Sequence, residues 1–207
     1  MHISEGVLSG PVLISGGALT VLGTAIGLKK LDYDRIPQVA LLSSVFFVTS
    51  IIHVSLGPSN VHLVLNGLLG LLLGWVAFPA VLVGLTLQAV LFQFGGLTTL
   101  GVNGLILAVP AVVVYYTLGP AARSRNRALT VIASFLSGFG AVFLSSLIMA
   151  VSLIFTDEAF WPMAKLVILA HLPVMVIEGL FVTVCVQFLK KVRPEILVVV
   201  YAAKYND

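Results

Sequence analysis

Charged residues are scarce in this sequence. Asp, Glu, Lys and Arg make up 9% of its 207 residues, whereas an ordinary soluble domain carries about 25%. Hydrophobic residues make up 59%, and the mean hydropathy is +1.14. So few charges cannot cover a water-facing surface, and the sequence has no basic stretch with interleaved aromatic residues that would bind nucleic acid. The composition excludes a soluble enzyme or a nucleic-acid-binding protein, and it predicts a protein that crosses the lipid bilayer several times.

Several patterns that carry catalysis are also missing. Cys185 is the one cysteine, so the chain can form neither a disulfide framework nor a metal cluster held by cysteines. The phosphate-binding loop G-x-x-x-x-G-K-[ST] is absent, which excludes ATP hydrolysis by that route. The metalloprotease pattern H-E-x-x-H and the nucleophile elbow G-x-S-x-G are absent as well. We therefore expect that the chain is not an enzyme.

Long apolar runs fill most of the sequence. A helix needs about 20 apolar residues to cross the bilayer core, and the runs predict an all-α membrane protein with a bundle of about seven transmembrane helices. The third run is short and Pro79 follows it soon, so it could be a half-helix or a re-entrant segment. The predicted segments are 10–28, 38–56, 61–74, 77–95, 103–118, 128–155 and 163–189.

The positive charges predict the topology. Nine of the eleven Lys and Arg lie in three short clusters, and each cluster follows a long apolar run, as in cytoplasmic loops. An even number of crossings must then separate consecutive clusters. Seven segments with the N-terminus outside and the C-terminus inside satisfy this condition. The clusters are Lys29, Lys30 and Arg35; Arg123, Arg125 and Arg127; and Lys190, Lys191 and Arg193.

This topology divides the chain into three parts. Residues 1–9 form an extracytoplasmic segment, residues 10–193 form a single helical bundle, and residues 194–207 form a cytoplasmic tail. No basic residue precedes the first apolar run, so we expect no cleavable signal peptide and a mature protein that begins at Met1 or His2. The expected location is the inner cell membrane, with multiple crossings.

Three of the four histidines, His2, His53 and His62, fall at or near the outer face in this topology. Imidazoles at one depth in a histidine-poor chain point to a metal site, because imidazole binds Zn, Cu, Fe and Ni. A histidine at position 2 can offer the α-amine of Met1, its own deprotonated amide and its imidazole Nδ1 to one ion. A fourth nitrogen, for example from His62, would complete the tetragonal geometry that Ni(II) and Cu(II) favour. The alternative is that His2 is part of a frayed terminus.

Further polar groups lie within the predicted spans. His171 and Glu178 are seven residues apart, so they share one helix face, and ionisable groups inside a membrane helix are usually functional. They could pack, couple to a partner or bind metal. Asn66 and Asn103 could support a metal ligand by hydrogen bonding or could join helices. His53 could relay the ion, support a ligand or cap a helix end.

Two pairs of glycines are spaced for close helix contact. They are Gly23 with Gly27 and Gly70 with Gly74. Small residues four apart allow helices to approach closely in a membrane. They could pack inside the bundle or form a docking surface for a partner membrane protein.

Four blocks of the sequence together resemble the CbiM/NikM family, the substrate-specificity (S) components of energy-coupling-factor transporters for cobalt and nickel. The similarity runs in the same order from residue 1 to about residue 190. The blocks are MHISEG at 1–6, VHLVLNGLLG at 61–70, FGGLTTLGVN at 94–103, and AHLP at 170–173 followed by IEG at 177–179.

The resemblance implies the fold of an S component and uptake of Co²⁺ or Ni²⁺ from outside. It implies a complex with a transmembrane coupling (T) protein, cytoplasmic ATPase subunits and, in many cases, a small accessory membrane protein. The family's metal ligands correspond to Met1, His2 and His62 here.

Two other functions remain open from the residues. A vitamin-binding S component would need no exposed α-amine, and a membrane metalloenzyme would use His171 and Glu178. Met1, His2 and His62 favour metal transport over both. A planar site of four nitrogens favours nickel, whereas cobalt is an equally common assignment for sequences of this type.

Overall fold

The computed structural model describes residues 2–51, 53–56 and 59–197, and for the segments 53–56 and 59–62 it describes the main chain. Helices dominate, and the longest are α1 (Gly10–Lys29), α5 (Leu100–Thr117), α7 (Arg127–Thr156) and α8 (Trp161–Val192). Shorter helices are α2 (Ile36–Thr49), α3 (Asn66–Leu73), α4 (Ala77–Phe92) and α6 (Gly119–Ala122). Three 3-10 turns complete the helical part: η1 (Tyr33–Arg35), η2 (Gly74–Val76) and η3 (Glu158–Phe160).

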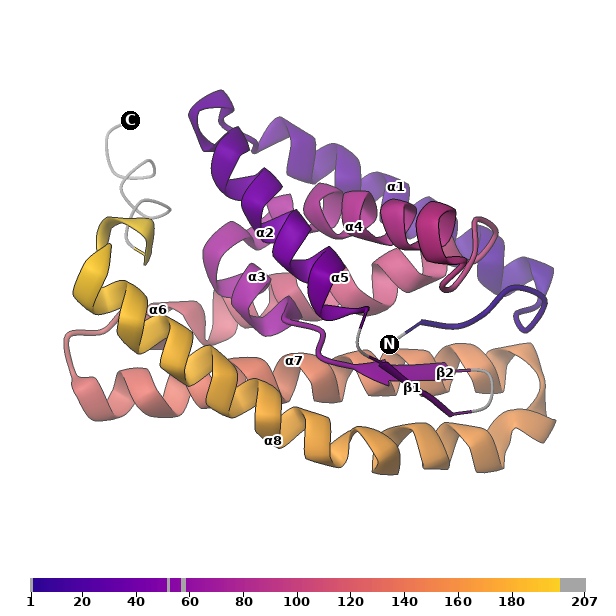
Figure 1. Cartoon of the computed structure of the whole chain (residues 1–207). Coiled ribbons are helices and arrows are strands. Elements are labelled where there is room, and N and C mark those ends of the chain that lie inside the picture. Colours follow the sequence, from indigo (N-terminus) through magenta and orange to yellow (C-terminus); the bar gives the residue numbers. More distant parts are fainter. Residues whose placement is uncertain (1, 52, 57–58, 198–207) are drawn as a thin grey trace.

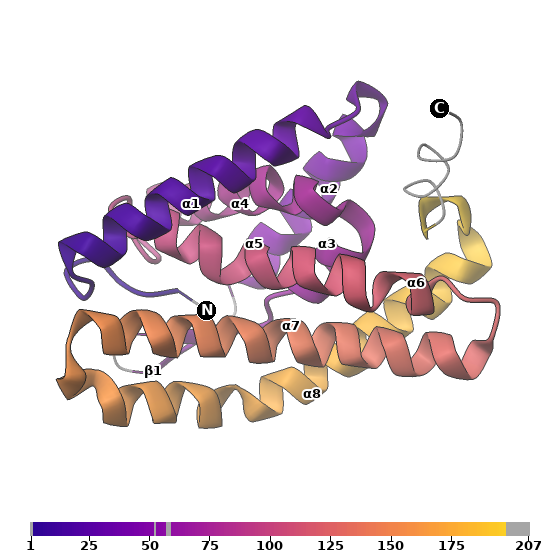
Figure 2. The same cartoon turned by 180° about the vertical axis from the view of Figure 1, so that it is seen from behind.

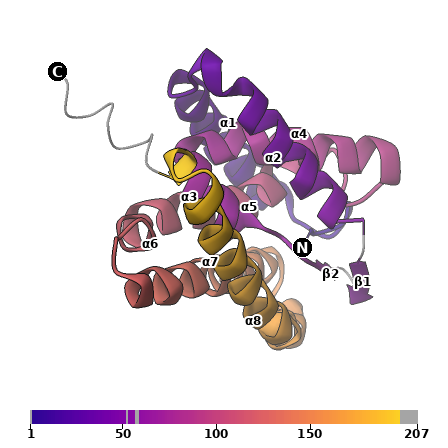
Figure 3. The ribbon, with the colours of Figure 1, turned by 60° about the vertical axis from the view of Figure 1, so that its left-hand side comes forward.

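The long helices α7 and α8 form an antiparallel pair along one side of the molecule, and α1, α2 and α4 lie on the opposite side (Figures 1 and 2). Between them, α5 contacts α1, α3, α4 and α7. A view turned toward one end of the molecule shows α3 and α5 in the middle of the bundle (Figure 3). All eight residues of α3 are buried, so this short helix forms the centre of the core.

Five stretches of the described chain are long and apolar enough to cross a membrane. They are α1, the stretch 66–92 that comprises α3, η2 and α4, α5, α7, and the stretch 158–192 that ends with α8. The protein is therefore helical, with several candidate membrane spans. The count of seven crossings and the sides on which the termini lie remain predictions.

The segment between α2 and α3 differs from the prediction. The expected helix over 38–56 ends at Thr49, and an antiparallel hairpin follows, formed by β1 (His53–Leu56) and β2 (Ser59–His62). At 14 residues α2 is only about 21 Å long, short of the ~30 Å hydrocarbon core. The predicted helix over 38–56 was therefore too long, although the protein is helical overall. The reason is that HVSL alternates polar and apolar residues and is followed by the turn residues Gly57 and Pro58, a strand signal that the overall hydrophobicity hides.

The third predicted segment, 61–74, contains a helix only from Asn66 to Leu73, in agreement with the expectation of a half-helix. Gly74 has a positive φ of 56°, and there the chain turns through η2 into α4. The helices α3 and α4 are thus separate, whereas residues 66–92 together make one candidate span, and two crossings by residues 61–95 remain a prediction.

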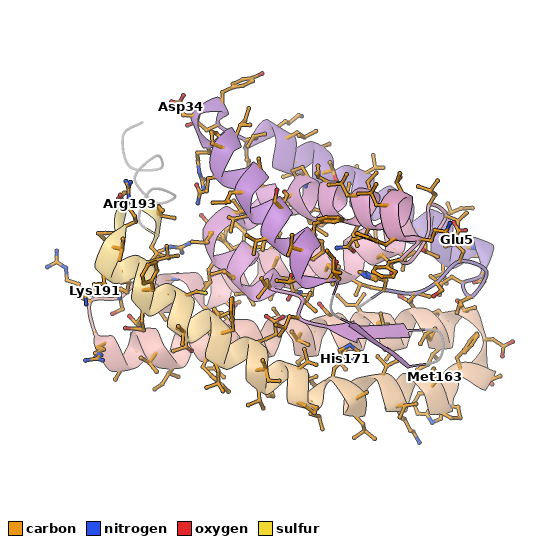
Figure 4. The ribbon with its side chains drawn as sticks, viewed as in Figure 1. Glu5, Asp34, Met163, His171, Lys191 and Arg193 are labelled. Carbon is orange, nitrogen blue, oxygen red and sulfur yellow. The ribbon has the colours of Figure 1, made fainter. Side chains whose placement is uncertain are left out.

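The three basic clusters lie at one end of the molecule. Figure 4 shows Asp34, Lys191 and Arg193 at that end, and Glu5 and Met163 at the other. Arg35 and Arg123 donate hydrogen bonds to the carbonyls of Leu72 and Leu71, at the C-terminal end of α3. Lys190 donates to the carbonyl of Ser124 and, at 2.7 Å, to the hydroxyl of Thr130. One residue of each cluster thus binds inside the bundle, in agreement with the placement of all three clusters on one side.

The glycine pairs pack within the chain. A Cβ on Gly27 would lie 2.5 Å from the carbonyl oxygen of Trp75, and one on Gly23 would overlap the ring of Phe78. A Cβ on Gly70 would overlap the carbonyl of Ala111, and one on Gly74 would lie 3.2 Å from the ring of Tyr115. The interpretation of these faces as a docking surface was therefore wrong, because neighbouring elements of the same chain already occupy them.

We predict that Gly27→Ala destabilises the protein by about 1–3 kcal/mol, because the added methyl group overpacks a main-chain contact. Gly17→Ala on the same helix is the matched control, since a Cβ there meets nothing within 4 Å and should stabilise the helix by up to ~1 kcal/mol. Thermal unfolding in detergent measures both effects. Equal unfolding midpoints for the two variants would contradict the internal packing of Gly27.

Candidate metal centre

The N-terminal segment enters the bundle instead of extending into solvent. His2 and Ile3 are each 1% exposed, although only a few residues precede α1. The segment passes between the α1 side of the molecule and the α7–α8 pair, close to the hairpin (Figures 1 and 2). A chain terminus usually frays unless specific contacts hold it. His2 is therefore held within the core, and the frayed-terminus alternative does not apply.

Asn103, in the first turn of α5, holds this segment through the main chain of Ile3. Its Oδ1 accepts the Ile3 N–H at 2.8 Å, and its Nδ2 donates to the Ile3 carbonyl at 3.0 Å. The same Nδ2 donates to the Thr99 hydroxyl at 3.2 Å, so the amide is oriented on both sides. Asn103 is itself 2% exposed. It therefore fixes the main-chain conformation of the residue that directly follows His2.

The loop between α4 and α5 covers the segment from the other side. The Glu5 N–H donates to the Gly95 carbonyl at 3.0 Å, and the Thr98 N–H donates to Glu5 Oε1 at 3.0 Å. Gly95 and Gly96 have φ angles of +75° and +142°, a region that residues with side chains rarely adopt. A Cβ on Gly95 would lie 2.9 Å from Asn103 Nδ2, and one on Gly96 would overlap the Glu5 side chain. Both positions require glycine.

The hairpin pairs two of the predicted histidines. In its register His53 lies opposite His62, at the end of the hairpin where the chain enters and leaves it. The side chains of both residues and all of Met1 lie outside the described part of the structure. The structure thus shows that the main chains of His53 and His62 pair, whereas the coordination of an ion by their side chains remains a prediction.

Glu178 on α8 holds the chain just after His62. Its Oε1 accepts the N–H groups of Val64 and of Leu65, the latter at 2.8 Å. Leu65 has a positive φ of 55°, so the chain turns sharply there before α3 begins. Glu178 is fully buried, and its carboxylate satisfies two main-chain donors that water cannot reach. Glu178 therefore positions the segment that carries His62.

Asn66 fixes the first residue of α3 to two other helices. Its Nδ2 donates to the Leu107 carbonyl of α5 at 3.2 Å and to the Ser145 hydroxyl of α7 at 2.8 Å. The Ser145 hydroxyl in turn donates to the Ile106 carbonyl at 2.8 Å. Asn66 thus joins helices, one of the two roles that the sequence left open for it.

His171 lies on the side of α8 that faces the hairpin (Figure 4). It is fully buried, and its Nδ1 donates to the carbonyl of Val167, one turn earlier, at 2.6 Å. Among the described residues no three side chains of His, Cys, Asp or Glu gather into a cluster. The predicted ligand set does not require such a cluster. Two of its four nitrogens are the Met1 amine and the His2 amide, and the other two are the imidazole nitrogens of His2 and His62.

Sequence reasoning missed three contributors to this site: Glu5, the Gly95–Gly96 pair and Ser145. Glu5 and the glycines lie in the two blocks MHISEG and FGGLTTLGVN, so the signal was present. The contact between these blocks joins residues about 90 positions apart and could not be derived from local spacing. Ser145 is one of several serines on α7, and nothing in the sequence distinguishes it.

The model of the family described as "Cobalt uptake substrate-specific transmembrane region", CbiM, matches residues 2–196. The chain belongs to the CbiM family. This match includes the buried N-terminal segment, the hairpin, α3 and both anchoring residues, Asn103 and Glu178. The sequence resemblance to this family is thereby confirmed.

Curated CbiM-family relatives align over nearly the whole chain. A "Putative metal transport protein" of Haemophilus influenzae is 38% identical, with 95% of this chain and 97% of the relative covered. A "Cobalt transport protein CbiM" of Kyrpidia tusciae is 30% identical, with 95% and 86% covered. A "Fused nickel transport protein NikMN" of Rhodobacter capsulatus is 32% identical, and the alignment covers 91% of this chain and 59% of the fused protein.

Two solved structures share the fold. A transition metal transporter superimposes with a TM-score of 0.80 at 23% identity, with 99% of this chain and all of that chain covered. A truncated transition metal transporter gives a TM-score of 0.79 at 24% identity, with 92% of this chain and 99% of that chain covered. The overall fold of this chain is thus shared with proteins of known crystal structure.

We predict that Asn103→Asp loosens the N-terminal segment. The carboxylate cannot donate to the Ile3 carbonyl, and an unsatisfied buried group costs about 1–3 kcal/mol. Hydrogen exchange at the Ile3 amide should accelerate about tenfold or more. Thr99→Val is the control, because it removes only the hydroxyl that Nδ2 also contacts. Unchanged exchange in Asn103→Asp would contradict the proposed anchoring role.

A second prediction concerns pH. The hydrogen bond from the Thr98 amide lowers the pKa of the exposed Glu5 carboxyl below its ordinary value of 4.5. Because the pKa of Glu5 is lower in the folded protein than in the unfolded protein, ionised Glu5 stabilises the folded loop at pH values above the unfolded pKa. This stabilisation is lost as the pH falls through the lowered pKa of the folded protein. The NMR shift of the Thr98 amide should therefore titrate below pH 4.5, and Glu5→Gln should abolish the titration. A Thr98 amide that titrates equally in Glu5→Gln would contradict this assignment.

Proposed function

We propose that this chain is the substrate-binding membrane subunit of an energy-coupling-factor transporter that imports Co²⁺ or Ni²⁺. The ion is captured from outside by the Met1 amine, the His2 amide and imidazole, and His62. The observation that carries this proposal is the burial of the N-terminal segment, with His2 at 1% exposure and Ile3 clamped by Asn103. Family membership over residues 2–196 supports it independently.

The anchoring geometry suits binding by main-chain nitrogen. A chelate that uses an amide nitrogen works only when the neighbouring main-chain angles are held, because the donor atoms must lie in one plane. Asn103 holds the residue after His2, and Glu178 holds the second and third residues after His62. The two parts of the ligand set are thus oriented by separate helices, α5 and α8. Such preorganisation reduces the entropy lost when the ion binds.

The roles of the remaining polar residues follow from their contacts. Asn66, Asn103 and Glu178 position main-chain segments and do not themselves bind the ion in the captured state. His53 lies opposite His62 in the hairpin and holds the strand that carries this ligand. The carboxylate of Glu5 closes the α4–α5 loop over the segment.

The energy for transport comes from partners. The chain has no phosphate-binding loop, and a ligand shifts a two-state equilibrium only by its differential affinity for the two states. We therefore assign ATP hydrolysis to cytoplasmic ATPase subunits, joined to this chain by a transmembrane coupling protein and a small accessory membrane protein. The complex operates in the inner cell membrane. Relatives named as fused NikMN and LarMN nickel transport proteins support association with a second component.

We predict that His2→Leu weakens Ni(II) and Co(II) binding at least about a hundredfold, which corresponds to ~3 kcal/mol of lost chelate energy. The substitution removes the imidazole that closes the six-membered chelate ring. The matched control carries one additional alanine after Asp207. Isothermal titration of the purified protein with its authentic N-terminus measures the affinities. Equal binding by both variants would place the ion elsewhere and overturn the ligand assignment.

A further inference from the structure

Three buried polar atoms near the proposed ligands have no role in capture. They are Nε2 of His171, Oε2 of Glu178 and Oδ1 of Asn66, and none has a hydrogen-bond partner among the residues that the structure describes. All three residues are fully buried. Leaving such buried atoms without a partner is energetically unfavourable. All three are acceptors, so a donor proton or a cation would satisfy each of them.

The protonation of His171 follows from its single hydrogen bond. A carbonyl oxygen can only accept, so the 2.6 Å contact with Val167 places a proton on Nδ1. In the neutral imidazole the lone pair then lies on Nε2. A histidine that donates Nδ1–H to a main-chain carbonyl and presents Nε2 is the usual arrangement of a metal ligand. His171 therefore already has the tautomer and the orienting bond that metal binding requires.

The amide of Asn66 is equally well defined. Its Nδ2 faces the Leu107 carbonyl, which can only accept, and the Ser145 hydroxyl, whose proton is used on Ile106. Rotating the amide by 180° would place oxygen against two acceptors. The oxygen of Asn66 therefore points away from these groups, and it is an acceptor like the second carboxylate oxygen of Glu178.

These atoms lie next to the segment that carries His62. Glu178 contacts Val64 and Leu65, and β2 packs on α8. Two residues of extended chain from Val64 to His62 cover about 7 Å, and two helical turns from Glu178 back to His171 cover about 10 Å. Figure 4 shows His171 on the face of α8 beneath the hairpin. The chain just after His62 thus contacts α8 at Glu178, and β2 packs on the same helix.

We propose that Nε2 of His171 is an inner ligand for the transported ion, the position that Co²⁺ or Ni²⁺ takes when the N-terminal chelate releases it. Glu178 Oε2 and Asn66 Oδ1 lie next along the same path, toward the end of α3 that contacts the basic clusters. The inference rests on the proposed function, because it adds a second stop for the ion after capture. Imidazole nitrogen with carboxylate and amide oxygen is a donor set that divalent first-row metals accept.

The transfer is a ligand exchange without any change in oxidation state. A bond from the ion to His171 Nε2 forms as a bond to one nitrogen of the N-terminal chelate breaks, and the released main-chain amide nitrogen regains from solvent the proton that it gave up when the ion bound. The ion keeps its 2+ charge. Because His171 and Glu178 are two helical turns apart, they form separate weak binding positions for the ion and do not bind it together. A transport path needs such stops, since tight binding along it would prevent release.

The experiment separates inner binding from capture. In the His2→Leu variant, Co(II) should bind weakly at His171, and His171→Asn should reduce that residual affinity at least tenfold. Asparagine keeps a donor for the Val167 carbonyl and removes the distal nitrogen, so helix packing is preserved. In the protein with its native N-terminus, His171→Asn should leave Ni(II) affinity within about twofold and reduce uptake by the complete transporter at least tenfold.

A second variant reports coordination directly. In the His2→Leu variant, His171→Cys should give a Co(II)–thiolate charge-transfer band in the near-ultraviolet, and the same protein with His171 intact, which retains Cys185, should give none. Absence of this band, or normal uptake by His171→Asn, would overturn the inner ligand while leaving capture intact. Absence of ion binding by the native N-terminus would instead overturn the proposed function on which the inference rests. The charge-transfer band of His171→Cys together with the loss of uptake by His171→Asn would establish His171 as the second binding position of the ion.

Discussion

The buried half-helix α3 depends on neighbouring side chains to satisfy its main-chain polar groups. Each unsatisfied group in an apolar interior costs several kcal/mol, and a helix of eight residues has unpaired donors at one end and unpaired acceptors at the other. Just before the first end, Glu178 takes the N–H groups of Val64 and Leu65, the two residues that lead into α3. At the other end, Arg123 and Arg35 donate to the carbonyls of Leu71 and Leu72. These contacts from three other segments allow α3 to remain in the centre of the bundle.

The candidate site follows from this constraint. Because Glu178 holds the turn before α3, it also holds the end of β2, and with it the main chain of His62. On the opposite side, Asn103 and the glycines at 95 and 96 hold the N-terminal segment that contains His2. The two halves of the proposed ligand set are therefore anchored independently. Moving α3 or α5 would separate them, and α3 is joined through arginines to the basic end of the molecule.

The interior of the site is correspondingly crowded with backbone contacts. A Cβ on Gly67 or Gly138 would overlap main-chain atoms of a neighbouring helix, and so would one on Gly70. Helices this close leave little space for adjustment, because cores are packed at near-crystalline density. Polar side chains that join them, such as Asn66, Ser145 and Asn103, then fix single arrangements. The same rigidity makes the unsatisfied acceptors on α3 and α8 informative, since they cannot easily turn toward other donors.

Much of the fold was predictable because hydrophobicity and charge are one-dimensional signals. The long apolar helices, the short third segment and the gathering of basic clusters follow from composition along the chain. The hairpin was not predicted, since a window over 38–56 averages its alternating pattern with the helix before it. The role of the glycine pairs could not be predicted for a related reason. Their spacing shows that one helix face lacks large side chains, but it does not show which neighbouring element packs on that face.

The sequence alone determined that this is a helical membrane protein of the CbiM family, with His2, His62, Asn103 and Glu178 as candidates. It determined these because each depends on residue identity or on spacing along one segment. Only the tertiary structure decided what Asn103 and Glu178 do, that Glu5 meets the glycine loop, and that Gly27 faces inward. These facts depend on contacts between residues about 50 to 115 positions apart, and only packing in three dimensions selects such contacts from the many that local sequence permits.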